Sequence, residues 1–247
     1  MAVTESRTER RRRFFANPDS YLTKWNYIID LRAQVVKEMV GDIRNCRILD
    51  LGCGDGRISL QFLSAGNHVT LVDASARMLE LAKRNTPVQH AAQVDYVVSD
   101  VLQFEPAAPY DVVLLIGVLA HLDSTNEAIA KIASCLGTNG RCICQLTDKD
   151  QFLRRCKRPL QWAYRLFRER LGYSPLKYTE MSLASIMSMS LQNGLRPVAT
   201  RRHLFLPIPW MLTLLGRRLI PYDAFVRNNA FLSRYGEDVI SMCQKEG

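Results

Sequence analysis

The sequence lacks an apolar run long enough to cross a bilayer, which takes about 20 residues. Its longest apolar stretch, residues 204–215, is interrupted by Pro207 and Pro209. The arginine run at residues 10–13 has no apolar segment behind it, so no secretory signal is expected. We therefore expect a cytoplasmic protein.

Cysteine pairs of the CxxC type are also missing, although the chain has seven cysteines. An odd number without such pairs predicts neither a disulfide framework nor a zinc ribbon. Cys142 and Cys144 lie two apart in an expected strand and so point to the same face. This favours core packing over metal binding, and we expect no metal.

Acidic residues are scarce in three segments of a chain whose net charge is +9. Residues 1–13, 149–177 and 207–235 carry net charges of +3, +7 and +3, so the remainder is net acidic. Basic segments attached to such a core indicate places where partners bind.

Between these segments, apolar runs of strand length alternate with stretches of helical periodicity. We expect strands at 47–51, 68–72, 94–98, 111–117, 141–146, 197–206 and 238–244, and helices at 14–41, 57–65, 75–84, 124–136 and 180–192. Residues 137–140 are expected to form a turn. The alternation predicts a doubly wound α/β sheet with helices on both faces. We expect residues 1–44 to form a basic arm and helix, and residues 45–247 to form one domain with insertions at about 148–179 and 207–235.

The sharpest motif is a glycine-rich loop that follows the first expected strand. It contains Gly52, Cys53, Gly54 and Gly56, with Asp50 just before it. Glycines at a strand-to-helix turn let the backbone approach a ligand closely. The spacing differs from the GxGxxG of dinucleotide-binding proteins, and a carboxylate beside the loop suits an ammonium group better than a pyrophosphate. An ordinary tight turn is the alternative.

Two further carboxylates follow the next two expected strands. Asp73 can accept the hydroxyls of a ribose, or it can cap the helix that starts near Ser75. Asp100 can accept an amine of an adenine, whose ring Val101 can pack against. The fourth strand ends near Ile116 and Gly117, where a ligand can approach the carboxyl edge of the sheet.

Together these residues resemble the class I S-adenosylmethionine-dependent methyltransferases of the small-molecule type. The resemblance implies a Rossmann-like seven-stranded sheet with an antiparallel last strand, and S-adenosyl-L-methionine as cofactor. It also implies cofactor-binding roles. Asp50, Gly52, Cys53 and Gly54 would hold the methionine moiety, and Asp73, Ala74 and Met78 would lie at the ribose. Asp100 and Val101 would bind the adenine, and Ile116 would line the floor of the site. The N-terminal helix would cover the cofactor.

Other classes fit less well. A nicotinamide-dependent oxidoreductase would need GxGxxG beside its catalytic Tyr-x-x-x-Lys, and no GxGxxG is present. A non-catalytic S-adenosylmethionine-binding module stays open as an alternative, although nothing obvious has been lost from the loop.

The acceptor is less well defined by the sequence. Methyltransferases of the same family that act on the amines of adenine or cytosine carry Asn/Asp-Pro-Pro-Tyr after the fourth strand. This chain has Ile-Gly-Val-Leu there, at residues 116–119, which favours a small-molecule O-methyltransferase. His121 is the candidate general base, although it could merely shape the pocket. His203 and Tyr178 are weaker candidates.

Aromatic and apolar residues lie among arginines at residues 154–168 and 205–218. Such segments can lie on an anionic membrane surface, or they can form a lid over the site. We expect a lipid-like or lipid-linked acceptor and a location in the cytoplasm, with peripheral attachment to a membrane. A soluble metabolite or sugar is the alternative. RNA or protein is a third, but nucleic acid is disfavoured because no RNA-binding module is recognisable. The oligomeric state is not predicted.

Overall fold

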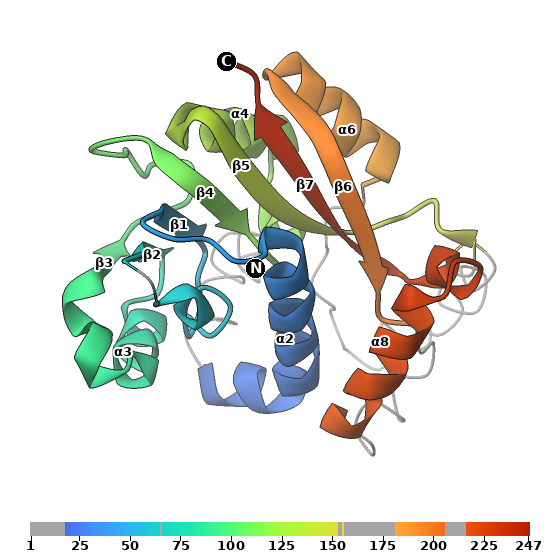
Figure 1. Cartoon of the computed structure of the whole chain (residues 1–247), viewed down its shortest axis with the longest axis horizontal. Coiled ribbons are helices and arrows are strands. Elements are labelled where there is room, and N and C mark those ends of the chain that lie inside the picture. Colours follow the sequence, from blue (N-terminus) through green and yellow to red (C-terminus); the bar gives the residue numbers. More distant parts are fainter. Residues whose placement is uncertain (1–17, 65, 153–154, 156–180, 206–215) are drawn as a thin grey trace, which may run out of the picture.

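The computed structural model describes residues 18–64, 66–152, 155, 181–205 and 216–247, with side chains described from residue 26 (Figure 1). Its centre is a seven-stranded sheet of order β3-β2-β1-β4-β5-β7-β6. The strands are β1 (Arg47–Leu51), β2 (His68–Asp73), β3 (Val94–Val98), β4 (Tyr110–Leu115), β5 (Leu136–Thr147), β6 (Leu195–His203) and β7 (Asp238–Lys245). The last strand, β7, runs antiparallel between β5 and β6, whereas β1 to β5 pair in parallel. The predicted Rossmann-like sheet is confirmed.

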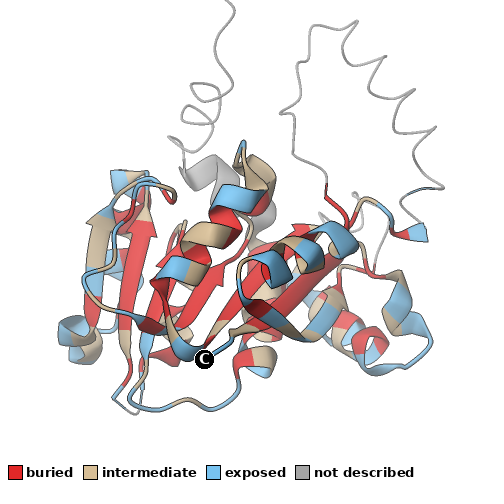
Figure 2. Cartoon of the chain, turned by 90° about the horizontal axis from the view of Figure 1, so that it is seen from above, coloured by how far each residue is buried: buried red, intermediate tan, exposed pale blue. Residues whose placement is uncertain are grey.

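Helices cover both faces of this sheet. They are α2 (Pro18–Val40), α3 (Ala76–Asn85), α4 (Thr125–Cys135), α6 (Leu183–Gln192) and α8 (Ile220–Asn228). Val36 of α2 and Leu79 of α3 share one core cluster with Ile48 of β1. Ile132 of α4 and Ile186 of α6 share a second cluster with Leu49, the next residue of β1. Alternate residues of each central strand thus point into opposite cores, and these strands are buried between the helices (Figure 2).

Serine side chains fix where three of the helices begin. Ser75, Ser124 and Ser182 each accept a hydrogen bond from the backbone N–H three residues later, at the start of α3, α4 and α6. Such caps satisfy N–H groups that have no partner inside the helix. At the other end of α2, Gly41 has a φ of 70° and donates to Lys37 O, which confirms the expected stop.

The helix expected at 57–65 is wrong. The segment makes turns and one short 3₁₀ helix, η1 (Leu60–Phe62). The Ser59 hydroxyl donates to the Asp50 carboxylate and also contacts Gly56 O, so it holds the start of the segment against β1. Only about ten residues separate the glycine loop from β2, and these local bonds compete with the helical pattern.

The turn expected at 137–140 lies instead within β5. Leu136 pairs with Tyr110 and Arg141 with Val112, so the four residues between them bulge out of the ladder. Asn139, with a φ of 60°, adopts the left-handed conformation that such a bulge needs. The sequence thus indicates the irregular residues 137–140 correctly, but β5 pairs with β4 both before and after them.

The insertion expected at 207–235 is helical over its described part. It contains η4 (Gly216–Leu219), α8 and η5 (Leu232–Tyr235) between β6 and β7. Leu219 packs with Tyr27 and Leu31 of α2, which lies beside α8 (Figure 1). Most of the insertion expected at 148–179 lies outside the described residues. No helix in the described part is long and apolar enough to span a membrane.

Candidate cofactor and acceptor site

The glycine loop after β1 lies against the end of β2. The backbone N–H groups of Gly52 and Cys53 both donate to Val72 O, at 2.8 and 3.0 Å. Gly52 has a φ of 73°, and a Cβ on it would lie 2.5 Å from Val118 Cγ2, in the segment that follows β4. Glycine is required here both by the backbone conformation and by the close approach of Val118.

Space is open over the next glycine of the loop. Gly54 has a φ of 57°, and a Cβ built on it would meet nothing within 4 Å. Its N–H donates to Asp73 Oδ2 at 2.9 Å. The loop therefore leaves room for a ligand beside a carboxylate, as a nucleoside-binding site requires.

Asp73 is held by two backbone N–H groups. Its Oδ1 accepts from Ser75 at 2.8 Å and its Oδ2 from Gly54. Burial raises the pKa of this carboxyl, while the two N–H donors act to lower it. Each oxygen has a further lone pair, so the fixed carboxylate can accept the two hydroxyls of a ribose. The side chain that caps α3 is that of Ser75, not that of Asp73, so the alternative role of Asp73 as the helix cap is wrong.

Asp50 is buried beneath the loop and accepts a 2.6 Å hydrogen bond from the Ser59 hydroxyl. Burial, the largest cause, and the charges of Asp73 and Asp55 together raise the pKa of Asp50 to about 7, against the lowering effect of the Ser59 hydrogen bond. A carboxyl that titrates near neutrality can respond to a cationic group placed above it. Ser59 was not expected as part of the site, because no motif marks it.

This raised pKa leads to a prediction about stability. Because the native state favours protonated Asp50, the carboxyl should cost increasing stability as pH rises from about 4 to about 7. Asp50→Asn should therefore match the wild type near pH 4 and gain roughly 3–5 kcal/mol relative to it by pH 8. Urea unfolding of both proteins at several pH values measures the difference, with exposed Asp95→Asn as a control. A difference that does not change with pH would contradict the assignment.

The residues after β3 form the neighbouring wall. Asp100 is exposed, and its Oδ1 accepts from Leu102 N at 2.9 Å, whereas Val101 is buried in the core. Ser99 N donates to Asp73 O, which ties this loop to the end of β2. The exposed carboxylate fits a role toward an adenine amine, but Val101 has little surface left for contact with a ring.

The other predicted residues divide between surface and core. Ala74 is exposed, while Met78 in the first turns of α3 is buried. Ile116 and Cys53 are buried in the same cluster. His121 ends the short 3₁₀ helix η3 (Leu119–His121) and is partly exposed. The site thus collects all four predicted loops at one edge of the sheet, and their individual ligand roles stay predictions.

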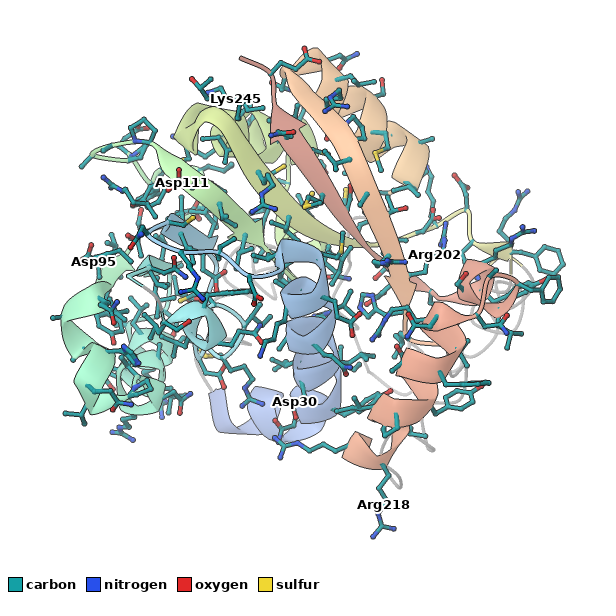
Figure 3. The ribbon with its side chains drawn as sticks, viewed as in Figure 1. Asp30, Asp95, Asp111, Arg202, Arg218 and Lys245 are labelled. Carbon is teal, nitrogen blue, oxygen red and sulfur yellow. The ribbon has the colours of Figure 1, made fainter. Side chains whose placement is uncertain are left out.

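Arg57 is a residue of this region that the motifs did not reveal. It donates to Asp55 Oδ2 at 2.6 Å within the loop and to Asp30 Oδ1 at 3.1 Å on α2. Asp30 also pairs with Arg217 of η4 (Figure 3 labels Asp30 on α2). These ion pairs connect the glycine loop with α2 and the β6–β7 insertion. That α2 covers the cofactor stays a prediction.

Metal binding has no evident place at this edge. Within the described ranges, no group of three or more His, Cys, Asp or Glu side chains is arranged to hold a metal ion. Cys142 and Cys144 are both buried in the core cluster shared with α4, as expected from their spacing.

Comparison with known proteins supports the fold and the site together. Residues 48–140 match a family model described as a methyltransferase domain. Magnesium protoporphyrin IX methyltransferase from Synechocystis PCC 6803 with bound SAH superposes with a TM-score of 0.66 at 17% identity, covering 98% of this chain and 100% of that one. A 1,6-didemethyltoxoflavin-N1-methyltransferase from Burkholderia thailandensis gives 0.57 at 17% identity, covering 100% and 93%.

The relatives found by sequence align with about half of this chain. The ubiquinone biosynthesis O-methyltransferase of Bordetella avium is 29% identical over 126 residues, which are 50% of this chain and 52% of that protein. The mitochondrial enzyme of the same name from Schizosaccharomyces pombe is 29% identical over 121 residues, covering 47% and 42%. The chain thus spans about half the length of the curated relatives it matches.

The sheet order, the glycine loop and the carboxylate after β2 define a Rossmann-like methyltransferase fold. Residues 48–140 carry a methyltransferase domain, and the chain has the fold of S-adenosylmethionine-dependent methyltransferases, in agreement with the resemblance and the cofactor class predicted from the sequence.

Proposed function

We propose that the chain transfers a methyl group from S-adenosylmethionine to an oxygen of a small, lipid-like acceptor. The observation that carries the cofactor assignment is the fixed carboxylate of Asp73 beside the open space over Gly54. The O-methyltransferase assignment follows the names of the relatives in ubiquinone biosynthesis, and ubiquinone is itself a lipid.

The bound cofactor supplies a methyl group on a sulfonium that is already activated. The protein therefore needs mainly to align the acceptor and exclude water. Asp73 orients the nucleoside, and the glycine backbone lets the methionine end lie close to the sheet. His121, just past the end of β4, is proposed as the base that takes the proton from an acceptor hydroxyl.

Calorimetric titration with S-adenosylhomocysteine tests the cofactor claim, with NADH as the control. Binding of the former alone is expected, and binding of neither would contradict the proposal. Transfer of a labelled methyl group to a long-chain alkyl catechol then tests the acceptor class against unsubstituted catechol, a histone mixture and total RNA. Preference for the alkyl catechol supports a lipid-like acceptor, whereas preference for catechol would favour a soluble metabolite.

His121→Ala and His121→Gln are compared in the same assay. Loss of a general base should lower kcat about 10²–10⁴-fold in both variants. A histidine that only shapes the pocket would raise KM and leave kcat nearly intact. His90→Ala, in the short 3₁₀ helix η2 (Val88–Gln93) before the amino end of β3 and so at the opposite edge of the sheet, is the matched control.

We further propose that the β6–β7 insertion attaches to an anionic membrane surface. Tyr222 and Phe225 of α8, together with Phe231, have exposed fractions of 46%, 68% and 61%. Arg218 lies on the same insertion and extends away from the domain (Figure 3). Exposed aromatics beside arginine suit an interface with anionic lipid.

Flotation with anionic vesicles checks this attachment. Phe225→Glu should reduce the vesicle-bound fraction several-fold because a charge replaces the exposed ring, whereas Val88→Glu, at a remote exposed site, should not. Wild-type protein that stays in solution with these vesicles would exclude this proposal.

A further inference from the structure

A second group of polar side chains lies at the carboxyl edge of the sheet, outside the predicted cofactor residues. Gln145 and Thr147 end β5, His203 ends β6, and Asp238 begins β7. Because β7 is antiparallel, Asp238 pairs in register with both Thr147 and His203. Arg32 of α2 reaches this group and donates to Asp238. In Figure 3 the label of Arg202 marks the end of β6, where the group lies.

The Asp238 carboxylate is fixed by three donors and orients Arg32. Its Oδ2 accepts from Arg32 Nη2 at 3.2 Å and from Gln145 Nε2 at 3.0 Å, and its Oδ1 accepts from Thr147 Oγ1 at 2.7 Å. Among the described residues, this is the one hydrogen bond that the guanidinium makes. Most of its donors are therefore uncommitted.

Arg32 lies next to the cofactor loop. A Cβ on Gly117 would lie 2.9 Å from Arg32 Nη1, just as a Cβ on Gly52 would lie 2.5 Å from Val118 Cγ2. Gly117 thus lies against the guanidinium of Arg32, and the next residue, Val118, lies against the glycine loop. An acceptor placed at Gly117 would meet the guanidinium on one side and the methyl donor on the other.

Unpartnered buried nitrogens concentrate around the same carboxylate. Over the described part of the chain, five buried side-chain N or O atoms have no hydrogen-bond partner. Three of them are Arg32 Nε and the two ring nitrogens of His203, whose side chain is fully buried. Buried polar atoms normally find partners, so unused ones gathered at one place point to a polar ligand.

The charge of this group favours one kind of ligand. His203 Nε2 lies 3.8 Å from Asp238 Oδ2, too far for a hydrogen bond. Burial, the largest cause, and the positive charges of Arg32 and Arg227 together lower the pKa of His203 to about 4 against the effect of Asp238, so the imidazole is neutral. Arg227 is committed to Asp223 and Glu38. The guanidinium of Arg32 is thus the cation presented toward Gly117.

We propose that Arg32 binds an acidic oxygen of the methyl acceptor, which makes the acceptor a phenol or enol rather than an amine. This rests on the proposed function and specifies its substrate class. The hydroxyl loses its proton to a base or to water, and its oxygen is held as an anion beside Arg32. An oxygen lone pair then forms the new O–C bond as the C–S bond breaks, and the sulfur keeps that electron pair as a thioether. Asp238 is a positioning residue for the guanidinium.

The experiment uses 4-nitrocatechol, whose absorbance reports ionisation, with the full chain saturated by S-adenosylhomocysteine. Bound to wild type, the probe should ionise at least one pH unit lower than when free, because a guanidinium stabilises the phenolate. Arg32→Met should abolish that shift and weaken probe binding at least tenfold, while S-adenosylhomocysteine affinity stays within twofold. Arg32→Lys should restore part of the shift. The isosteric 4-nitro-1,2-phenylenediamine should bind at least tenfold more weakly than the catechol.

Folding is controlled by a second variant. Arg32→Met leaves Asp238 without its ion-pair partner, so Arg32→Met combined with Asp238→Asn removes both charges and retains acceptors for Gln145 and Thr147. The double variant should bind S-adenosylhomocysteine normally and show no probe shift. The proposal is overturned if the probe fails to bind wild type or if the diamine binds equally well. It is also overturned if Arg32→Met, alone or combined with Asp238→Asn, retains the shift in the ionisation of the probe. Failure of wild type to bind S-adenosylhomocysteine would instead contradict the proposed function.

Discussion

Asp73→Ala is expected to weaken S-adenosylhomocysteine binding about 10²–10⁴-fold. Two hydrogen bonds from ribose hydroxyls to a carboxylate are worth roughly 1.5–3 kcal/mol each, and each 1.4 kcal/mol is a factor of ten in affinity. The variant also releases Gly54 N and Ser75 N, which the carboxylate holds in the native loop. The loss of the ribose hydrogen bonds and the release of these two N–H groups both reduce affinity, but only the release of the N–H groups changes the protein without ligand.

Asp73→Asn separates these two effects. Its side chain keeps an oxygen for one backbone N–H but loses the charge, so affinity should fall by an intermediate factor. Asp95→Ala, on the neighbouring strand β3 with a carboxylate that is 64% exposed, should bind normally. Calorimetry gives the affinities and thermal unfolding without ligand gives the stabilities. Unchanged affinity in a folded Asp73→Ala protein would show that the ribose lies elsewhere.

The strands that carry these residues could be predicted because their signals are local. β1 and β3 have the predicted bounds, and α3 begins within one residue of its predicted start. Parallel pairing then places the loops after β1 to β4 at one edge of the sheet without further information. The glycine spacing and Asp73 are therefore recognisable from the order of the residues alone.

The acceptor side could not be predicted in the same way. Arg32 and Asp238 lie 206 positions apart, and their contact depends on β7 inserting between β5 and β6. His203 attracts notice only as an isolated histidine, because nothing near it in sequence indicates Asp238 as its neighbour. The failed helix at 57–65 has the same cause: Ser59 bonds to Asp50 across the loop, which a periodicity pattern does not reveal.

Gly52→Ala should lower stability by roughly 2–5 kcal/mol. A left-handed conformation costs a residue with a Cβ about 1–2 kcal/mol, and overlap in a packed site costs about 1–3 kcal/mol more. The overlap is specific, because the new methyl group would lie 2.5 Å from Val118 Cγ2. For a chain of this length the fall in Tm should be about 5–15 °C.

Val118→Ala in the Gly52→Ala background should recover the overlap part of that loss, because it removes the methyl group that collides. Gly54→Ala is the matched comparison: its backbone is equally left-handed, but its Cβ would point into open space. Gly54→Ala should lower stability only by the cost of the left-handed backbone, about 1–2 kcal/mol. Its S-adenosylhomocysteine affinity should fall, because the methyl group fills room left for the ligand. If Gly52→Ala and Gly54→Ala lost equal stability, or if Val118→Ala gave no recovery, the contact between the cofactor loop and the segment after β4 would be wrong. That contact is also what brings Gly117, against which Arg32 lies, next to the glycine loop, so thermal unfolding of these variants tests the geometry on which the proposed acceptor recognition rests.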